Sequence, residues 1–297
     1  MYDIVIVGAG PAGLTAALYA LRANKKVLVL EAKAYGGQIL NAAKVENYPG
    51  IKSISGFDFA TELYNQVKDL GCEIKFESVI RIEKDKTVVT NNNTYKAKTI
   101  ILATGAENRK LNIENEKNLI GKGVSYCATC DGNFFKNKIV AVAGGGNTAL
   151  EDVVYLSDLA KKVYLIHRRD EFRGEKKYLE EVKSKENVEI ILNSNIVKIN
   201  GTEKVESIVI EDNNKNQTNI EVDGLFIAIG QSPKNQIFAN IIELDEKGYI
   251  KSEDGVHTNI PKIYVAGDAR VKVLRQLTTA VSDGSIAAVT AIKEMED

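Results

Sequence analysis

The sequence has few of the residues on which several common classes of protein depend. It contains 3 cysteines and 2 histidines among 297 residues, too few cysteines for the disulfide framework of a secreted protein. Positive charge is not in excess, since 39 Lys and Arg residues stand against 40 Asp and Glu residues, so a surface that binds nucleic-acid phosphates is not expected. No apolar run approaches the roughly 20 residues of a membrane span, and no basic segment typical of a signal peptide precedes the first apolar run. We therefore expect a soluble, cytoplasmic protein that binds neither nucleic acid nor membranes.

The spacing of apolar residues predicts two nucleotide-binding units. Residues 2–31 read as strand, glycine-rich turn, helix and strand, and residues 138–173 repeat this order. Each unit later has an apolar run closed by glycine, at 99–106 and 224–233, as buried strands of a parallel sheet do. A chain of 297 residues has room for about two domains. The predicted fold class is α/β, with two Rossmann-like, doubly wound domains.

The glycines of the first turn are spaced as G-x-G-x-x-G. Gly8 permits a tight turn, Gly10 lets the backbone approach a pyrophosphate, and Gly13 allows the helix to pack closely on the strand. Glu31 closes the second strand, where a carboxylate can accept hydrogen bonds from ribose hydroxyls. These residues predict a site for an adenine dinucleotide.

The second turn repeats the spacing as G-x-G-x-x-A, with Gly144, Gly146 and Ala149. At the position where the first unit has its carboxylate, the second unit has a cluster of basic residues: His167, Arg168, Arg169 and Arg173. A carboxylate would repel a 2′-phosphate, whereas guanidinium groups bind one bidentately, so this site is expected to prefer NADPH to NADH. The alternative interpretation is a charged loop with local ion pairs.

Two of the cysteines, Cys127 and Cys130, form a C-x-x-C pair. Such a pair can be half of a zinc site, a redox disulfide or two unrelated thiols. Zinc needs about four ligands, and the remaining candidates, Cys72, His167 and His257, are widely scattered, so no metal site is expected. Cys72 is most simply a small buried apolar residue.

A set of short stretches resembles the low-molecular-weight, bacterial-type thioredoxin reductases, which are class II pyridine nucleotide-disulfide oxidoreductases, over essentially the whole chain. The stretches are GAGPAG, GGQ, ENYPG, ATG, CATCDG, GGGNTALED, HRRDEFR, VAGDA and RQLTTAVSDG. The resemblance implies a discontinuous FAD-binding domain of residues 1–111 and 244–297, with an NADPH-binding domain of residues 112–243 inserted between its parts and carrying the C-x-x-C pair. Asn147, Thr148 and Gly174 are mild departures that could soften the cofactor preference.

The resemblance also assigns cofactor-binding residues. Those expected to bind FAD are Gly8, Gly10, Pro11, Ala12, Gly13, Glu31, Gly37, Gln38, Asn47, Ala103, Thr104, Gly105, Gly267, Asp268, Arg275, Gln276 and Leu277. Those expected to bind NADPH are Gly144, Gly146, Asn147, Thr148, Ala149, His167, Arg168, Arg169 and Arg173.

The activity that the resemblance implies is a relay of electrons from NADPH through FAD to a Cys127–Cys130 disulfide, and then to thioredoxin by thiol exchange. Cys130 would face the flavin, Cys127 would attack thioredoxin, and Asp131 would be the acid and base, although Asp131 could also simply cap a turn. A homodimer is implied. Two alternatives stay open: a flavin thioredoxin reductase that takes electrons from ferredoxin rather than NADPH, and a flavin-binding redox sensor that does not turn over.

Overall fold

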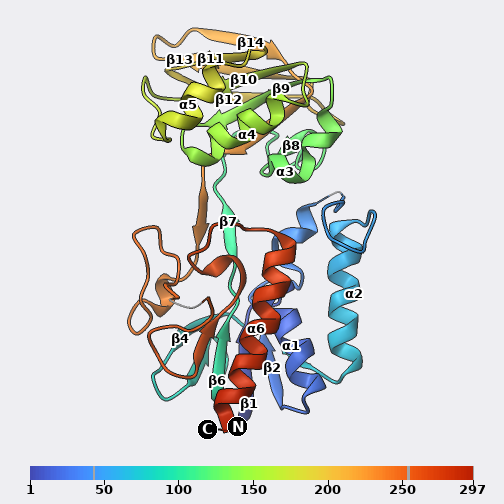
Figure 1. Cartoon of the computed structure of the whole chain (residues 1–297), viewed down its shortest axis with the longest axis vertical. Coiled ribbons are helices and arrows are strands. Elements are labelled where there is room, and N and C mark those ends of the chain that lie inside the picture. The colour runs from blue at the N-terminus through green and yellow to red at the C-terminus, as the bar shows by residue number, and fades with distance from the viewer. Residues whose placement is uncertain (43, 253–254, 297) are drawn as a thin grey trace. The chain divides into compact units, whose positions relative to one another are not determined.

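The computed structural model describes residues 1–42, 44–252 and 255–296, and its chain divides into two compact units (Figure 1). The first unit joins Met1–Glu107 to Ser232–Asp297, and the second unit is Asn108–Gln231. This division puts the end of the inserted unit before residue 243, because Phe238 and Ile242 are buried in the core of the first unit.

A mostly parallel sheet forms the centre of the first unit. Its strands are β1 (Tyr2–Val7), β2 (Val27–Leu30), β3 (Glu73–Lys75), β4 (Val79–Ile82), β5 (Thr87–Thr90), β6 (Thr94–Leu102) and β17 (Ile263–Val265). The strand order is β3-β2-β1-β6-β5-β4, and β17 pairs with β6. The pairs of β1 with β2 and β6, of β2 with β3 and of β17 with β6 are parallel, whereas β4 and β5 form a hairpin antiparallel to the start of β6.

Helices cover one face of this sheet. The helices of the first unit are α1 (Pro11–Arg22), α2 (Gly56–Asp69) and α6 (Leu277–Glu296), with short 3-10 turns η1 (Gly37–Asn41), η3 (Gln236–Phe238) and η4 (Gly267–Ala269). The three helices lie side by side (Figure 1). Their apolar residues share one core with Ile4 and Ile6, while Val5 and Val7 belong to a second core on the opposite face. The strand β1 is apolar throughout its buried part because both of its faces are covered.

The second unit repeats this design with a parallel sheet in the order β11-β10-β9-β15-β8. Its elements are β8 (Val124–Ser125), α3 (Ala128–Asp131), η2 (Gly132–Phe135), β9 (Ile139–Gly144), α4 (Asn147–Ser157), β10 (Lys162–Ile166), α5 (Lys176–Lys183), β11 (Val188–Ile191) and β15 (Gly224–Ala228). Helices α3, α4 and α5 pack on one face. An antiparallel sheet of β12 (Ser194–Asn200), β13 (Ser207–Asp212) and β14 (Gln217–Glu221) covers the other.

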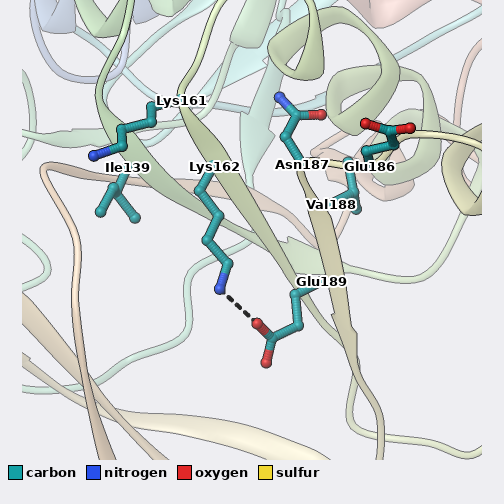
Figure 2. A pocket seen from close by; sticks show the side chains of 7 residues that line it. All are labelled: Ile139, Lys161, Lys162, Glu186, Asn187, Val188 and Glu189. Atoms are coloured by element: carbon teal, nitrogen blue, oxygen red, sulfur yellow. Dashed lines mark ion pairs between the residues drawn. The ribbon is translucent and has the colours of Figure 1, made fainter.

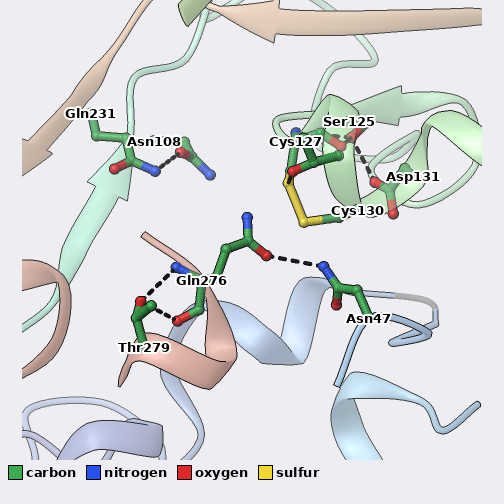
Figure 3. Close-up of a disulfide and its surroundings, with 10 residues drawn as sticks. Asn47, Asn108, Ser125, Cys127, Cys130, Asp131, Gln231, Gln276 and Thr279 are labelled. Atoms are coloured by element: carbon green, nitrogen blue, oxygen red, sulfur yellow. Dashed lines mark hydrogen bonds between the residues drawn. A yellow bond between two sulfur atoms is a disulfide. The ribbon is translucent and has the colours of Figure 1, made fainter. Parts of the chain in front are cut away.

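The chain passes between the units through two short strands, β7 (Ala106–Asn108) and β16 (Gln231–Pro233), which pair with each other. The Gln231 Nε2 amide donates to Asn108 Oδ1 over 3.0 Å (Figure 3). The predicted α/β fold with two doubly wound sheets is thus the one observed. In the part of the chain that the structure describes, no helix is long and apolar enough to cross a membrane.

Candidate functional site

The first glycine turn lies between β1 and α1, at the carboxyl end of the parallel strands. Gly8 has a φ of 109°, and a Cβ there would collide with the carbonyl oxygen of Ala103. A Cβ on Gly13 would collide with the carbonyl oxygen of Gly8, so glycine at this position lets α1 approach the turn. At Gly10 the backbone is ordinary and a Cβ would meet no atom within 4 Å. The protein fold does not require glycine at position 10, and this open space fits a pyrophosphate at the start of α1.

The Glu31 carboxylate is fixed beside this turn. Its Oε2 accepts a hydrogen bond from the Ala9 N–H over 2.8 Å, and its Oε1 accepts one from the Lys33 N–H over 2.9 Å. Because a carboxylate can accept about four hydrogen bonds, Glu31 keeps acceptor capacity for ribose hydroxyls.

Segments that are distant in the sequence close around the same turn. The Gly36 N–H donates to the Ala9 carbonyl oxygen over 2.8 Å, and a Cβ on Gly37 would lie 3.4 Å from the Gly10 Cα. A Cβ on Gly267 would lie 2.8 Å from the Cβ of Ala12. The predicted residues of η1, α1 and η4 are therefore brought together.

Other predicted residues of the first unit are held by side-chain contacts. Asn47 Nδ2 donates to Gln276 Oε1 over 3.0 Å (Figure 3). Thr104 Oγ1, just after β6, donates to Oδ1 of Asn235, a fully buried residue, over 2.7 Å. Pro11 is the first residue of α1 and Leu277 the first of α6, while Gln38 lies in η1.

Two buried polar atoms near η4 fit a ligand. Among the described residues, neither Asp268 Oδ1 nor Arg275 Nε has a hydrogen-bond partner, although both atoms are buried. Burial also raises the pKa of the Asp268 carboxyl, against the lowering effect of Lys272 and Arg275. Buried polar atoms without partners cost free energy, so a ligand with hydroxyl or amide groups would complete this site. The donors, the acceptors and the open space at Gly10 fit the polar groups of FAD.

Asp283 supports this region and was not predicted from the sequence. Its carboxylate accepts from Arg270 Nε and Nη2, both over 2.9 Å, from Lys272 Nζ over 2.8 Å and from the Gly267 N–H over 3.0 Å. Burial by itself would raise the pKa of Asp283, but the hydrogen bonds from Arg270 and Lys272 outweigh it and hold the pKa below its usual range. Asp283 thereby ties α6 to η4 and the loop that follows.

The second glycine turn lies between β9 and α4. A Cβ on Gly144 would come within 2.5 Å of the Ala228 carbonyl oxygen and 2.6 Å of the Ala149 Cβ, whereas one on Gly146 would meet no atom within 4 Å. As in the first unit, a side chain would therefore collide with the protein at the first glycine of the turn but not at the second. The site is open for a pyrophosphate in the same way.

The segment 167–175 is attached to this turn. The His167 ring occupies the space where a Cβ of Gly145 would stand, stacks on Phe172 and hydrogen-bonds through Nε2 to the Glu171 carbonyl oxygen over 3.1 Å. The N–H groups of Arg173 and Gly174 both donate to the Gly145 carbonyl oxygen. These contacts hold the arginine-bearing segment beside the place where a dinucleotide would lie.

His167 and the arginines differ in charge and exposure. Burial lowers the pKa of His167, so its ring is neutral near pH 7 and does not supply a cation. The side chains of Arg168, Arg169 and Arg173 are exposed, and none of the ion pairs among the described residues includes them. Guanidinium groups without local carboxylate partners fit a 2′-phosphate better than the alternative of a self-paired charged loop.

Two further residues predicted to bind NADPH have different surroundings. Asn147 Nδ2 donates to Glu175 Oε1 over 2.7 Å, and the Glu175 N–H donates to Asn147 Oδ1 over 2.8 Å, so this side chain ties α4 to the arginine segment. Thr148 is exposed on the first turn of α4.

The C-x-x-C pair forms a disulfide in the second unit (Figure 3). Cys127 precedes α3 as its N-cap residue and Cys130 lies within α3, with their Cα atoms 5.3 Å apart. Asp131 follows directly, and its Oδ2 accepts from the Ser125 hydroxyl over 2.6 Å. Burial raises the pKa of Asp131, and the Ser125 hydrogen bond opposes this shift. A partly buried carboxyl next to a disulfide is placed to exchange protons with thiols.

The third cysteine and a separate pocket lie apart from this chemistry. Cys72 is buried, as predicted, and is not part of a disulfide. No group of His, Cys, Asp and Glu side chains in the described ranges could hold a metal ion.

Figure 2 shows a pocket lined by Ile139, Lys161, Lys162, Glu186, Asn187, Val188 and Glu189. It lies at the amino ends of β9, β10 and β11, opposite the edge at which parallel sheets bind ligands.

Comparison with known proteins places the chain in a family. Residues 2–284 match the pattern that defines the pyridine nucleotide-disulphide oxidoreductases. The chain is 43% identical over 302 residues to the thioredoxin reductase of Listeria innocua, covering 100% of this chain and 95% of that protein. It is 40% identical over 304 residues to the thioredoxin reductase of Bacillus subtilis, covering 100% and 96%.

A solved structure supports the same assignment. The thioredoxin reductase of Streptococcus pyogenes superimposes with a TM-score of 0.96 at 40% identity, covering 100% of this chain and 98% of that one. The resemblance seen in the sequence motifs is therefore confirmed. With its two glycine turns and its Cys127–Cys130 disulfide, the chain belongs to the pyridine nucleotide-disulphide oxidoreductase family.

Proposed function

We propose that this chain is an NADPH-dependent thioredoxin reductase that holds FAD in its first unit and NADPH in its second. Flavin and nicotinamide cofactors are general to the family, and the relatives described above are named thioredoxin reductases. The observation that carries the proposal is the Cys127–Cys130 disulfide, with the Asp131 carboxyl directly beside it on α3. We further propose a homodimer in the cytoplasm, where a disulfide is expected to be catalytic rather than structural.

The first unit would bind FAD through the turn at Gly8 to Gly13, the Glu31 carboxylate and the unpaired polar atoms of Asp268 and Arg275. FAD, when bound, supplies transfer of an electron pair between a nicotinamide and a disulfide. The protein contributes the position of the ring and the hydrogen bonds that tune its potential.

The second unit would choose between nicotinamide cofactors through its arginine segment. The 2′-phosphate of NADPH would be bound by Arg168, Arg169 and Arg173, which are exposed beside the turn at Gly144 to Gly146. This argues against the ferredoxin-dependent alternative, which has no need of such a cluster.

The reduced Cys127–Cys130 pair would act by thiol exchange. The Cys127 thiolate attacks one sulfur of the thioredoxin disulfide, so that a mixed disulfide forms and the other thioredoxin sulfur leaves as a thiolate. Asp131 in its acid form donates a proton to that thiolate. Cys130 then attacks the Cys127 sulfur, which restores the Cys127–Cys130 disulfide and releases the second thioredoxin thiolate to take up a proton. Two electrons pass to thioredoxin in total.

An anaerobic titration of the purified yellow protein tests the cofactors. The flavin colour is expected to be lost on addition of NADPH and much less readily on addition of NADH. Steady-state consumption of NADPH with oxidised thioredoxin then separates the three functions. A ferredoxin-dependent enzyme would bleach with reduced ferredoxin but not with NADPH, and a redox sensor would bleach once without sustained consumption.

A further inference from the structure

Ser125 occupies a fixed place at the edge of the second unit's sheet. The strand β8 that carries it pairs in parallel with β15, where Ser125 lies opposite Phe226. Only 4% of Ser125 is exposed. A buried serine at the end of a paired strand has little freedom to move, so what its hydroxyl contacts is set by the fold.

The Ser125 hydroxyl connects two parts of the disulfide site (Figure 3). Its oxygen accepts the Cys127 N–H over 3.1 Å. Its single hydrogen has two possible acceptors, Asp131 Oδ2 at 2.6 Å and the Cys127 carbonyl oxygen at 3.3 Å. The shorter bond to a carboxylate is the stronger one, so the hydroxyl links the Cys127 amide to the Asp131 carboxylate.

We propose that Ser125 is a positioning residue for the thiol chemistry, holding the Asp131 carboxylate in place beside the Cys127–Cys130 pair and favouring its ionised form. The proposal deepens the proposed function and rests on Asp131 as the proton carrier. A hydrogen bond to the ionised form lowers the pKa of a carboxyl, and here it opposes the effect of burial.

The titration of Asp131 must be distinguished experimentally from that of the other ionisable groups around it. Helix α4, which packs against α3, carries Glu151, Asp152 and Tyr155, and Tyr126 follows β8. Burial, and secondarily the charge of Glu151, raises the pKa of Asp152 to about 7, so the signal of Asp152 must be distinguished from that of Asp131. An Asp131→Asn variant identifies which signal belongs to Asp131, and an Asp152→Asn variant identifies the other.

The test is a pH titration of the FAD-loaded protein by difference infrared spectroscopy, in which the carbonyl stretch of a protonated carboxyl is followed. In Ser125→Ala the midpoint assigned to Asp131 is expected to rise by about one pH unit, because the ionised form loses its donor. Ser125→Thr keeps a hydroxyl and should keep the wild-type midpoint, whereas Ser125→Val has the same shape without it and should behave like the alanine variant. Ser194→Ala, which removes another buried strand serine of the same unit, should leave the midpoint unchanged.

Kinetics give the second readout. When NADPH-reduced enzyme is mixed with oxidised thioredoxin over a range of pH, the limb of the rate profile due to Asp131 should move upward in Ser125→Ala by the same amount, and Asp131→Asn should abolish that limb. An unshifted Asp131 midpoint in both Ser125→Ala and Ser125→Val overturns the proposal. If wild-type protein does not reduce thioredoxin, the proposed function fails, but the infrared titration still decides whether Ser125 controls the carboxyl.

Discussion

Cys72 and Cys127 are expected to differ in reactivity because their surroundings differ. Cys72 is 3% exposed, and burial raises the pKa of its thiol to about 11, so it holds almost no thiolate at neutral pH. Cys127 is only partly buried and precedes a short helix. Thiolates are the reactive form of cysteine, so the exchange chemistry belongs to Cys127 and Cys130.

Replacing Cys127 by Ser should leave reduction of the flavin by NADPH intact and abolish reduction of thioredoxin, because hydride transfer precedes the thiol step. Replacing Cys130 should have the same effect on turnover. The Cys127 variant keeps the thiol expected to face the flavin and should show it as a charge-transfer band. Stopped-flow absorbance and a thioredoxin assay measure both steps. Cys72→Ala is the control, and thioredoxin reduction at the wild-type rate in either serine variant would contradict the assignment.

The arginine segment is expected to distinguish the two nicotinamide cofactors. NADH lacks the 2′-phosphate that Arg168, Arg169 and Arg173 would bind. A charge-assisted hydrogen bond lost from such a site changes affinity by about tenfold or more, so each Arg→Ala change should raise the KM for NADPH by that factor and barely change the KM for NADH.

The matched control for this series is Lys183→Ala, which removes an exposed cation from α5 of the same unit. It should leave both KM values unchanged. Equal effects of the arginine changes on NADPH and NADH would show that the segment is only a solvated loop.

At the scale of elements, each of the two glycine turns contains a glycine that the fold requires and a glycine that only the ligand would require. Gly10 and Gly146 have backbone conformations that alanine adopts, and a Cβ at either meets no protein atom within 4 Å. Gly10→Ala should therefore keep the thermal stability of the FAD-free protein but weaken FAD retention, and Gly146→Ala should raise the KM for NADPH.

Gly8→Ala is the contrasting variant, since Gly8 has a φ of 109° and a Cβ there collides with Ala103. It should lower the unfolding temperature even without FAD. Thermal denaturation and flavin release measure these effects. A large loss of FAD-free stability in Gly10→Ala would show that the position serves the fold rather than the ligand.

The attachment of α6 to η4 depends on one carboxylate. Asp283 is 5% exposed and binds Arg270 and Lys272. Removing one partner of a buried ion pair costs about 3–5 kcal/mol, so Asp283→Asn should destabilise the FAD-loaded protein by that order at pH 7. Because the folded pKa of Asp283 lies below its unfolded value near 3.9, its contribution is complete above about pH 4 to 5 and is lost as pH falls through the folded pKa.

The stability difference between wild type and Asp283→Asn should therefore narrow in acid, as urea titrations at several pH values would show. Glu83→Gln, which breaks the exposed ion pair with Arg81, is the control and should change stability by less than about 1 kcal/mol. A difference that does not change with pH would mean that the charge of Asp283 is not what holds α6.

At the scale of the whole molecule, the distribution of the reacting groups predicts a domain movement. The disulfide and the second glycine turn belong to one compact unit, and the first glycine turn belongs to the other. A nicotinamide and a disulfide would each have to come within about 3–3.5 Å of the flavin to react, and reduced Cys127 must also reach a protein-sized partner. We expect a rigid-body rotation of the inserted unit, observed as Asn108–Gln231 rather than 112–243, about hinges near the two chain crossings.

A reversible disulfide between cysteines introduced one in each unit tests this movement. The protein locked with Cys127–Cys130 against the flavin should stop NADPH oxidation coupled to thioredoxin, and reduction of the lock should restore it. The same two cysteines left reduced are the control. Full turnover in the locked protein would rule the rotation out.

The sequence by itself was enough to predict the two strand-turn-helix units, the α/β fold class, the roles of Gly8 and Gly13, and the importance of Cys127 and Cys130. These features depend on local requirements: apolar spacing sets each strand and helix, and close backbone approach at a turn admits only glycine. The burial of Cys72 could be read in the same local way from an apolar neighbourhood.

Only the tertiary structure decided which polar side chains support the site. The contacts of Asp283 with Arg270, of Thr104 with Asn235 and of Ser125 with Asp131 are made by packing elements together, and no spacing rule in a single sequence specifies them. His167 occupies a cationic position in the sequence pattern, but folding buries its ring against Gly145 and lowers its pKa. Charge and hydrogen bonding depend on burial and neighbours, which the fold creates and the residue type alone does not.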